Sequence, residues 1–387
     1  MGPPSQGRRR RTAILAAFAV VCLLYVLFHS TTPSSSSSAF TNSTSSPHAD
    51  RHSALPLLDD LKSETGVAAF EHSTARRLQR LFPYELALHK RYPRTIWQTW
   101  KYSTSDSRFS AKFRTAVEFW SKLNPEFTHE ILDDDTAANF VRQLYASVPE
   151  VVEAYFAMPK PILRADFFRY LILLARGGVY SDIDTTALKG VTKWFSDGVS
   201  DIVKDEEGNE KTALTEERAT EIARTIESDT GLMVGIEADP DRPDWQDWYA
   251  RRVQMCQWTI AAKRGHPTVL RIVSHITTET LRRKVTGTID LPKTKDAGSQ
   301  IMNWTGPGIW TDTVFGYLAD IQAGTDWHNV TGITRGKVIG DVLILPITSF
   351  SPGVGTMGAN PPDHPHAFVQ HIFEGSWKPA NERNIGG

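Results

Sequence analysis

The 387-residue sequence predicts an α/β protein with a largely parallel sheet, held to a membrane by one N-terminal helix. Two observations predict the sheet. Strand-like and helix-like segments alternate from residue 95 onward, and the strongest helical segment leads directly into a short apolar strand. A third observation predicts the anchor, because a basic cluster at 8–11 precedes an uncharged apolar run. The expected order is a basic tail (1–11), a transmembrane segment (12–28), a stem (29–64) and one folded domain (65–387).

The apolar run over 12–28 is shorter than the ~20 residues that an average bilayer requires, but thinner membranes of the early secretory pathway accept it. Arginines precede it, and no acidic residue, lysine or arginine follows until Asp50. This asymmetry places the N-terminus in the cytosol and the remainder in the lumen. A cleaved signal peptide is the alternative, but it would end at a small-x-small site that we do not find here.

The segment over 29–64 is rich in Ser, Thr and Pro and cannot bury enough apolar surface to fold, which predicts a flexible stem. N-glycosylation triplets begin at Asn42, Asn303 and Asn329, in agreement with a luminal location. The formal net charge of −1 argues against a nucleic-acid partner.

The elements of the folded domain follow from their patterns in chain order. Apolar residues at helical spacing, with capping and stop signals, predict helices over 65–90, 111–124, 136–158, 161–177 and 308–320. Runs of β-branched and aromatic residues predict strands over 95–100, 128–132, 179–184, 231–237 and 341–350. The charged stretch over about 204–229 predicts a solvated insertion.

Two carboxylates, Asp182 and Asp184, stand at the end of the predicted strand over 179–184. In α/β sheets, ligands bind beyond the carboxyl ends of the strands, and side chains at i and i+2 of an extended chain project to the same side. Two carboxylates that face one way repel unless a cation lies beside them. Hard ions such as Mg²⁺ or Mn²⁺ take oxygen ligands and complete their shells with substrate phosphates. The pair therefore predicts a metal–diphosphate site for a nucleotide-activated substrate.

Three neighbouring patterns bear on this hypothesis. A second acidic run, 133–135, precedes a helix-like segment, where helix capping explains it. Asp166 and Arg169 lie three residues apart on the strongest helix, which predicts either an ordinary surface ion pair or part of the same cleft. His371 is a candidate third metal ligand, although a lone histidine more often has a structural hydrogen-bonding role.

Longer motifs surround these residues. The segment "LRADFFRYLILLARGGVYSDIDT", with "PRTIWQTW" before it and "NWTGPGIWTD" and "HIFEGSWK" after it, resembles glycosyltransferase family 32. Within that family it is most similar to the fungal initiation-specific α-1,6-mannosyltransferases of the Golgi, and the similarity runs over about 91–378. The resemblance implies a GT-A fold, a GDP-mannose donor, Mn²⁺ or Mg²⁺ as cofactor, and an N-glycan oligomannose acceptor. It also implies a single-pass type II protein of the Golgi membrane, which can form complexes with other mannosyltransferases.

The resemblance also implies a role for each matching residue. Asp182 and Asp184 match the catalytic, metal-binding pair, and His371 matches the histidine that faces the metal. Asp166 and Arg169 match the helix residues that hold donor hydroxyls and phosphate. The remaining residues implied in donor binding are Trp97, expected to contact the base, Arg164 and Tyr180, together with Ser376, Trp377 and Lys378, of which the last two would close over the diphosphate. Gly306 and Pro307 are expected to shape the acceptor side.

The implied chemistry is transfer with retention, because an α-linked donor sugar gives an α-1,6 product. The metal would stabilise the departing diphosphate as a Lewis acid. No carboxylate in these motifs is an obvious nucleophile, which favours front-face displacement over two successive displacements. Two other functions remain as alternatives: an inositol-phosphorylceramide mannosyltransferase, and a non-catalytic subunit of a mannan-elongating complex.

Overall fold

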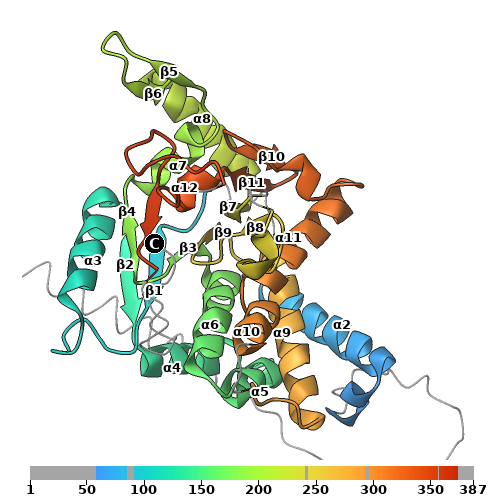
Figure 1. Cartoon of the computed structure of the whole chain (residues 1–387). Coiled ribbons are helices and arrows are strands. Elements are labelled where there is room, and N and C mark those ends of the chain that lie inside the picture. The colour runs from blue at the N-terminus through green and yellow to red at the C-terminus, as the bar shows by residue number, and fades with distance from the viewer. Residues whose placement is uncertain (1–57, 85–90, 240–242, 293–295, 356, 374–387) are drawn as a thin grey trace, which may run out of the picture. The chain divides into compact units, whose positions relative to one another are not determined.

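The computed structural model describes residues 58–84, 91–239, 243–292, 296–355 and 357–373 (Figure 1). All of these lie in one compact unit, residues 55–387. The predicted basic tail, the transmembrane segment over 12–28 and most of the stem lie outside the described residues and stay predictions. Within the described ranges, no helix is both long and apolar enough to cross a bilayer.

One mixed sheet forms the centre of this unit (Figure 1). Its strands lie in the order β10 (Lys337–Ile339), β11 (Val342–Leu345), β7 (Leu232–Ala238), β9 (Thr259–Ala262), β3 (Gly178–Ser181), β1 (Thr95–Thr99) and β2 (Thr128–Leu132), with β8 (Gln254–Met255) paired to β7. The pairings make β2, β1, β3, β7 and β11 run in one direction and β9, β10 and β8 in the other. Most of the strands thus end at one edge, where ligands of α/β sheets bind.

The sequence did not predict that β9 runs against its neighbours. All four β9 residues are buried, and the strand has no polar alternation to mark it. Its antiparallel pairing with both β3 and β7 makes the central sheet mixed, although most strands remain mutually parallel.

Two small sheets complete the strand content of the described residues. In one, β4 (Thr185–Ala187) pairs antiparallel with β12 (Val369–His371), and His371 lies opposite Thr185. In the other, β5 (Ile202–Lys204) and β6 (Glu210–Thr212) form a hairpin. The first sheet is important for the site because it brings a C-terminal strand to the turn that follows β3.

Helices pack around the sheet (Figure 1). They are η1 (Leu58–Lys62), α2 (Glu64–Leu81), α3 (Ala111–Leu123), α4 (Asp134–Leu144), α5 (Pro149–Ala157), α6 (Pro161–Arg176), α7 (Val191–Asp197), α8 (Glu216–Asp229), η2 (Trp245–Asp247), α9 (Pro267–Val285), α10 (Asp296–Trp304), α11 (Pro307–Ile321), η3 (Trp327–Asn329) and α12 (Ile347–Phe350). Helix α9 contacts α2, α5, α6 and α11, whereas α3 packs on β4 and α12 on β7. Buried residues of α6 contribute to the largest apolar cluster of the unit.

Several boundaries differ from those predicted. The helix expected over 136–158 is two helices, α4 and α5, because Pro149 cannot continue the ladder of α4 and instead begins α5. The strand expected over 341–350 ends at Leu345, since Pro346 begins the short helix α12. The stretch over 204–229 is mostly solvated, as predicted, but its helix α8 is docked through Glu227, which is buried and pairs with Arg94 (2.9 Å).

Two glycines make the sharp connection from α6 to β3. Gly177 has φ of +67° and Gly178 has φ of +102°, conformations that residues with a Cβ rarely adopt. A Cβ on Gly178 would lie 2.5 Å from the carbonyl oxygen of Thr95 in the paired strand β1. The connection therefore sets the position of the α6 side chains relative to the end of β3.

We expect Gly178→Ala to lower the free energy of unfolding by ~2–5 kcal/mol, the sum of backbone strain of ~1–2 kcal/mol and overpacking of ~1–3 kcal/mol. Gly208→Ala is a matched control, because Gly208 also has positive φ (+86°) but no atom lies within 4 Å of the position that a Cβ would take there. The control should show the strain alone, ~1–2 kcal/mol. Urea denaturation measures the free energy of unfolding of both variants. Equal losses would show that the close contact with β1 adds nothing to the cost of the substitution at Gly178.

Candidate functional site

The acidic pair lies in a turn and not in a strand. β3 ends at Ser181, and the predicted strand over 179–184 is wrong at this point. The carbonyl oxygen of Asp182 accepts hydrogen bonds from the backbone N–H of Thr185 (3.1 Å) and from its hydroxyl (2.6 Å), which closes the turn. The side chain of Gln98 donates to the same carbonyl (3.0 Å). A tight turn, and not the alternation of an extended chain, therefore brings the two carboxylates together.

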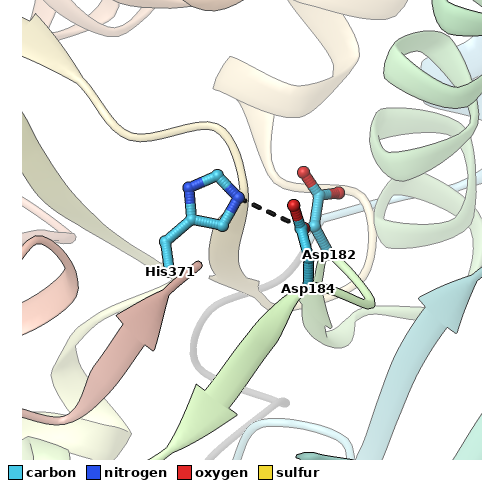
Figure 2. Close-up of side chains that lie close together, drawn as sticks. All are labelled: Asp182, Asp184 and His371. Carbon is cyan, nitrogen blue, oxygen red and sulfur yellow. Dashed lines mark hydrogen bonds and ion pairs between the residues drawn. The ribbon is translucent and has the colours of Figure 1, made fainter. Parts of the chain in front are cut away.

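Asp182, Asp184 and His371 form a cluster whose potential ligand atoms all lie within 4.8 Å of one another (Figure 2). Nε2 of His371 lies 3.2 Å from Oδ1 of Asp184. The ring of Trp258 stacks on the His371 ring at 4.6 Å between centroids and 18° between planes, which holds the imidazole in place. Two carboxylates and one imidazole are a donor set that suits a divalent metal ion, with further positions left for water or phosphate oxygens. The three residues predicted as metal ligands are thus brought together.

A buried ion-pair chain connects this cluster to α6. Arg169 contacts Asp166 (3.0 Å) and, on its other side, Asp182 (3.2 Å), and its side chain is only 4% exposed. The hydroxyl of Thr305 (2.9 Å) and the side-chain amide of Gln257 (3.2 Å) donate to Asp166. The sequence was compatible with Asp166 and Arg169 forming either a surface ion pair or part of the cleft, and the structure places both in the site.

Burial and charge act against each other in this chain. Burial raises the pKa of Asp166 to about 6, although Arg169 and the hydrogen bond from Thr305 oppose the shift. Burial also raises the pKa of Asp182, again against the effect of Arg169. Burial lowers the pKa of Arg169, but the carboxylates of Asp182 and Asp166 outweigh it and hold the pKa above its usual value. One guanidinium thus faces two acids, with Asp184 close by, and a divalent cation would offset the remaining negative charge.

Three residues expected to bind the donor lie in different surroundings. The hydroxyl of Tyr180 bonds Thr99 (3.1 Å), and the Arg169 guanidinium lies 5.3 Å above the Tyr180 ring, so Tyr180 supports the site from below. Trp97 is 8% exposed, and its indole N–H donates to the carbonyl of Gly177 (2.9 Å). Trp97 therefore packs in the core with little surface for a base. Arg164 lies apart from both, in the wall of a cavity.

This cavity, of about 620 Å³, lies at the end of β1, and its wall is completed by residues of α4, α5 and α6. Its wall includes Thr99, which connects it to Tyr180, and the acidic side chains of Asp134 and Asp135. The first residue of that acidic run, Asp133, caps α4 as predicted, by accepting from the N–H of Thr136 (2.8 Å). The other two acids are not explained by capping. Arg142, Arg164, Tyr155, Phe156 and Phe168 also line the wall.

Sequence reasoning missed the residues that support the cluster. Trp258 and Gln257 follow β8 in a segment for which no contact with the site was expected, and Thr305 precedes the two residues expected to shape the acceptor side. In the structure, Gly306 and Pro307 begin α11 and thereby direct Thr305 at Asp166. The Gly306–Pro307 pair could have predicted the start of a helix, but nothing in the sequence indicated that Thr305 before it would contact Asp166.

The remaining predicted residues are placed as follows. Ser376, Trp377, Lys378 and Asn42 lie outside the described residues. Asn303 is exposed on α10, although Trp304 and Thr305 of its triplet are buried. Asn329 is exposed in η3.

Comparison with known proteins gives a consistent group of matches. Residues 110–201 match the family model described as a glycosyltransferase sugar-binding region containing a DXD motif. The Candida albicans protein named initiation-specific alpha-1,6-mannosyltransferase is 44% identical over 321 residues, covering 80% of this chain and 77% of that protein. The Saccharomyces cerevisiae protein of the same name is 34% identical, covering 81% and 84%. A Schizosaccharomyces pombe inositol phosphoceramide mannosyltransferase is 29% identical over 92 residues, 24% of each chain.

Removing the guanidinium of Arg169 tests the ion-pair chain. We expect Arg169→Met to lower the free energy of unfolding by ~3–5 kcal/mol at pH 8, because the buried carboxylate of Asp166 and the partly exposed one of Asp182 lose their partner. A carboxyl whose pKa is higher in the folded than in the unfolded state destabilises the fold as pH rises between those two values. In the unchanged protein this interval for Asp166 runs from 3.8 to about 6, and its upper end rises when Arg169 is removed. The stability lost by Arg169→Met should therefore be smaller at pH 5, where Asp166 is mostly protonated in both proteins, than at pH 8.

Urea denaturation at pH 5 and pH 8 measures this difference. Arg271→Met is the control, since Arg271 forms an exposed pair with Asp320 (2.6 Å) whose loss should change stability by at most ~1 kcal/mol at either pH. A loss from Arg169→Met that does not depend on pH would contradict the electrostatic account.

Proposed function

The chain belongs to the initiation-specific α-1,6-mannosyltransferases of glycosyltransferase family 32, and we propose that it transfers mannose from GDP-mannose to the mannose core of an N-glycan through an α-1,6 bond. The observation that carries the proposal is the cluster of Asp182, Asp184 and His371, joined to Asp166 through Arg169. The location of these groups beyond strand ends of a mixed α/β sheet supports a GT-A arrangement.

Asp182, Asp184 and His371 would hold Mn²⁺, which supplies positive charge to the diphosphate of the donor when bound. Asp182 is 24% exposed at its side chain and so remains accessible. Arg169 is enclosed, and in this geometry it acts by fixing Asp182 and Asp166 and by adding a fixed positive charge beneath them. Mg²⁺ would fit the two carboxylates, but the imidazole favours Mn²⁺.

Retention of the α configuration follows from a front-face displacement. The bond between C1 of mannose and the phosphate oxygen breaks, and the electron pair leaves with GDP. The 6-hydroxyl oxygen of the acceptor bonds C1 on the same face, and its proton passes to the departing phosphate oxygen. Asp166 and Arg169 keep Asp182 and the fixed positive charge beside it in place, so that the site does not have to rearrange during this exchange.

The cavity at the end of β1 supports a nucleotide donor with a guanine base. Its volume of about 620 Å³ is in the range of small-molecule sites, and its wall combines aromatic rings, arginines and carboxylates. Guanine presents two adjacent N–H donors, on N1 and N2, which one carboxylate can accept together. Asp134 lines this wall together with Arg164, and we assign the guanine contact to Asp134.

The location and partners of the protein are part of the proposal. The basic, apolar and Ser/Thr-rich N-terminal segments support a single-pass type II protein of the Golgi membrane with a luminal catalytic domain. A complex with other mannosyltransferases is compatible with this location. The alternative of an inositol-phosphorylceramide mannosyltransferase has weaker support, since the match to such a protein spans 24% of this chain.

The first test is a transfer assay with the full-length chain in detergent, GDP-mannose, Mn²⁺ and an oligomannose acceptor. We expect an α-1,6-linked product that disappears on chelation. Asp184→Ala should lower turnover by at least ~100-fold, because loss of a metal ligand removes several kcal/mol of transition-state stabilisation. Asp205→Ala, in the exposed turn between β5 and β6, should retain full activity. Near-normal turnover of Asp184→Ala would refute the metal assignment.

Base recognition has a separate test in nucleotide binding. Inosine diphosphate lacks the 2-amino group of guanine, so the intact protein should bind GDP ~10-fold more tightly, as expected for one hydrogen bond to a charged acceptor. Asp134→Asn should abolish this preference, whereas Asp135→Asn should keep it. Calorimetric titration of both nucleotides measures the ratio, and a ratio unchanged in Asp134→Asn would place the guanine contact elsewhere.

A further inference from the structure

Three enclosed polar atoms around the site lack hydrogen-bond partners within the described protein. They are Nε of Arg169, Nδ1 of His371, whose Nε2 faces Asp184, and Oε2 of Glu237. Figure 2 shows Nδ1 on the side of the ring away from both aspartates. Most buried polar atoms in native proteins are paired, and an unpaired one costs about 1–3 kcal/mol. Nε of Arg169 belongs to a side chain already held by Asp166 and Asp182, so Nδ1 of His371 and Oε2 of Glu237 are the two atoms that call for a functional explanation.

Glu237 lies at the same sheet edge as the cluster. It is the penultimate residue of β7, which runs in the same direction as β3, so both strands end where the acidic turn begins. Ile236 pairs with Met255 and Ala238 with Gln254, which leaves Glu237 as the extra residue of a β-bulge. Bulges beside active sites commonly redirect one side chain. Glu237 occupies such a position.

The charged groups that act on Glu237 are few. Burial raises the pKa of Glu237 to about 7, while a hydrogen bond from the side chain of Gln254 and the charge of His371 lower it. On the other side, Glu237 contributes to the raised pKa of the buried Cys256 thiol. Gln254 accepts from the N–H groups of Ala250 and Arg251 through its carbonyl, so its amide is the group that donates. Oε2 is left for a further donor.

We propose that Glu237 is a positioning residue that accepts a hydrogen bond from Nδ1–H of His371, through one bridging water or after a small rotation, and so directs Nε2 at the metal. The inference rests on the metal site of the proposed function. A histidine that binds a metal through Nε2 carries its proton on Nδ1, and that proton normally has a carboxylate, carbonyl or water as acceptor. Such a partner fixes the tautomer and the ring orientation, and raises the basicity of the ligand.

Two other roles of Glu237 explain the arrangement less well. Among the described residues, the ligand grouping contains Asp182, Asp184 and His371 but not Glu237, which argues against direct coordination. A purely structural role is met only in part, because the Glu237 carboxylate receives a hydrogen bond from Gln254 while Oε2 has no hydrogen-bond partner. If Glu237 serves the metal ligand, replacing its carboxylate should leave stability unchanged or increase it.

The experiment is a titration of Mn²⁺ into the full-length protein in detergent, without nucleotide or acceptor, with free Mn²⁺ followed by electron paramagnetic resonance. We expect Glu237→Gln to weaken binding ~10-fold, the lower end of the effect of such partners. His371→Ala should weaken it at least as much, and the double variant should bind like His371→Ala alone. Asp239→Asn, which removes another acidic group two residues along the chain, should bind like the unchanged protein.

Each result has one meaning. Equal binding by Glu237→Gln and the unchanged protein, or additive losses in the double variant, would overturn the inference. A loss of the same size in Asp239→Asn would also overturn it, because general charge would then explain the effect. If the unchanged protein binds no Mn²⁺, the proposed metal site itself is wrong. Glu237→Met, with a side chain of similar size, replaces Glu237→Gln should the latter fail to fold, and melting curves check both.

Discussion

The enclosed guanidinium of Arg169 is the contact on which the site depends. It lies between Asp166 of the same helix and Asp182 of the turn after β3, and its side chain is 4% exposed. Two carboxylates could not remain close together in such surroundings without a cation. The position of Arg169 on α6 therefore determines where the acidic turn can lie, and the glycine connection from α6 to β3 makes that position possible.

Segments far apart in the sequence converge on this chain of charges. Gln257, after β8, and Thr305, before α11, complete the hydrogen bonds of Asp166. The strand β12 brings His371 beside Asp184, at the opposite end of this row of charged side chains from Asp166. The ring of Trp258 stacks on the imidazole and holds it there. Each connection adds a constraint to the same few atoms. The site is consequently organised before any ligand arrives, which is what electrostatic stabilisation of a developing charge requires.

Local patterns predicted the parts of this site that depend on neighbours in sequence. The helical period of α6 and its glycine end placed Asp166 and Arg169 in the correct helix, because these signals are local in sequence. Asp182 was placed directly after the apolar part of β3, but the strand was wrongly extended through the acidic pair, which lies in a turn. The burial of Trp97 was not predictable, because a tryptophan after a β-branched residue looks the same whether its ring faces a ligand or the core. Glu237 was missed for a related reason: a glutamate near a strand end is usually solvated, and only the bulge in β7 turns it inward.

Burial of the charged and polar groups of the site has both a stabilising and a destabilising effect. Apolar clusters on both faces of the sheet stabilise the unit, and Asp166 and Arg169 are buried at the strand ends beside them. Burial strengthens the interaction of Arg169 with Asp166, whereas Nδ1 of His371 and Oε2 of Glu237 have no hydrogen-bond partner among the described protein groups. A site built for charge stabilisation therefore carries an energetic penalty in its resting state. Cation binding would lower that penalty at the carboxylates, which couples the stability of the strand ends to occupancy of the site.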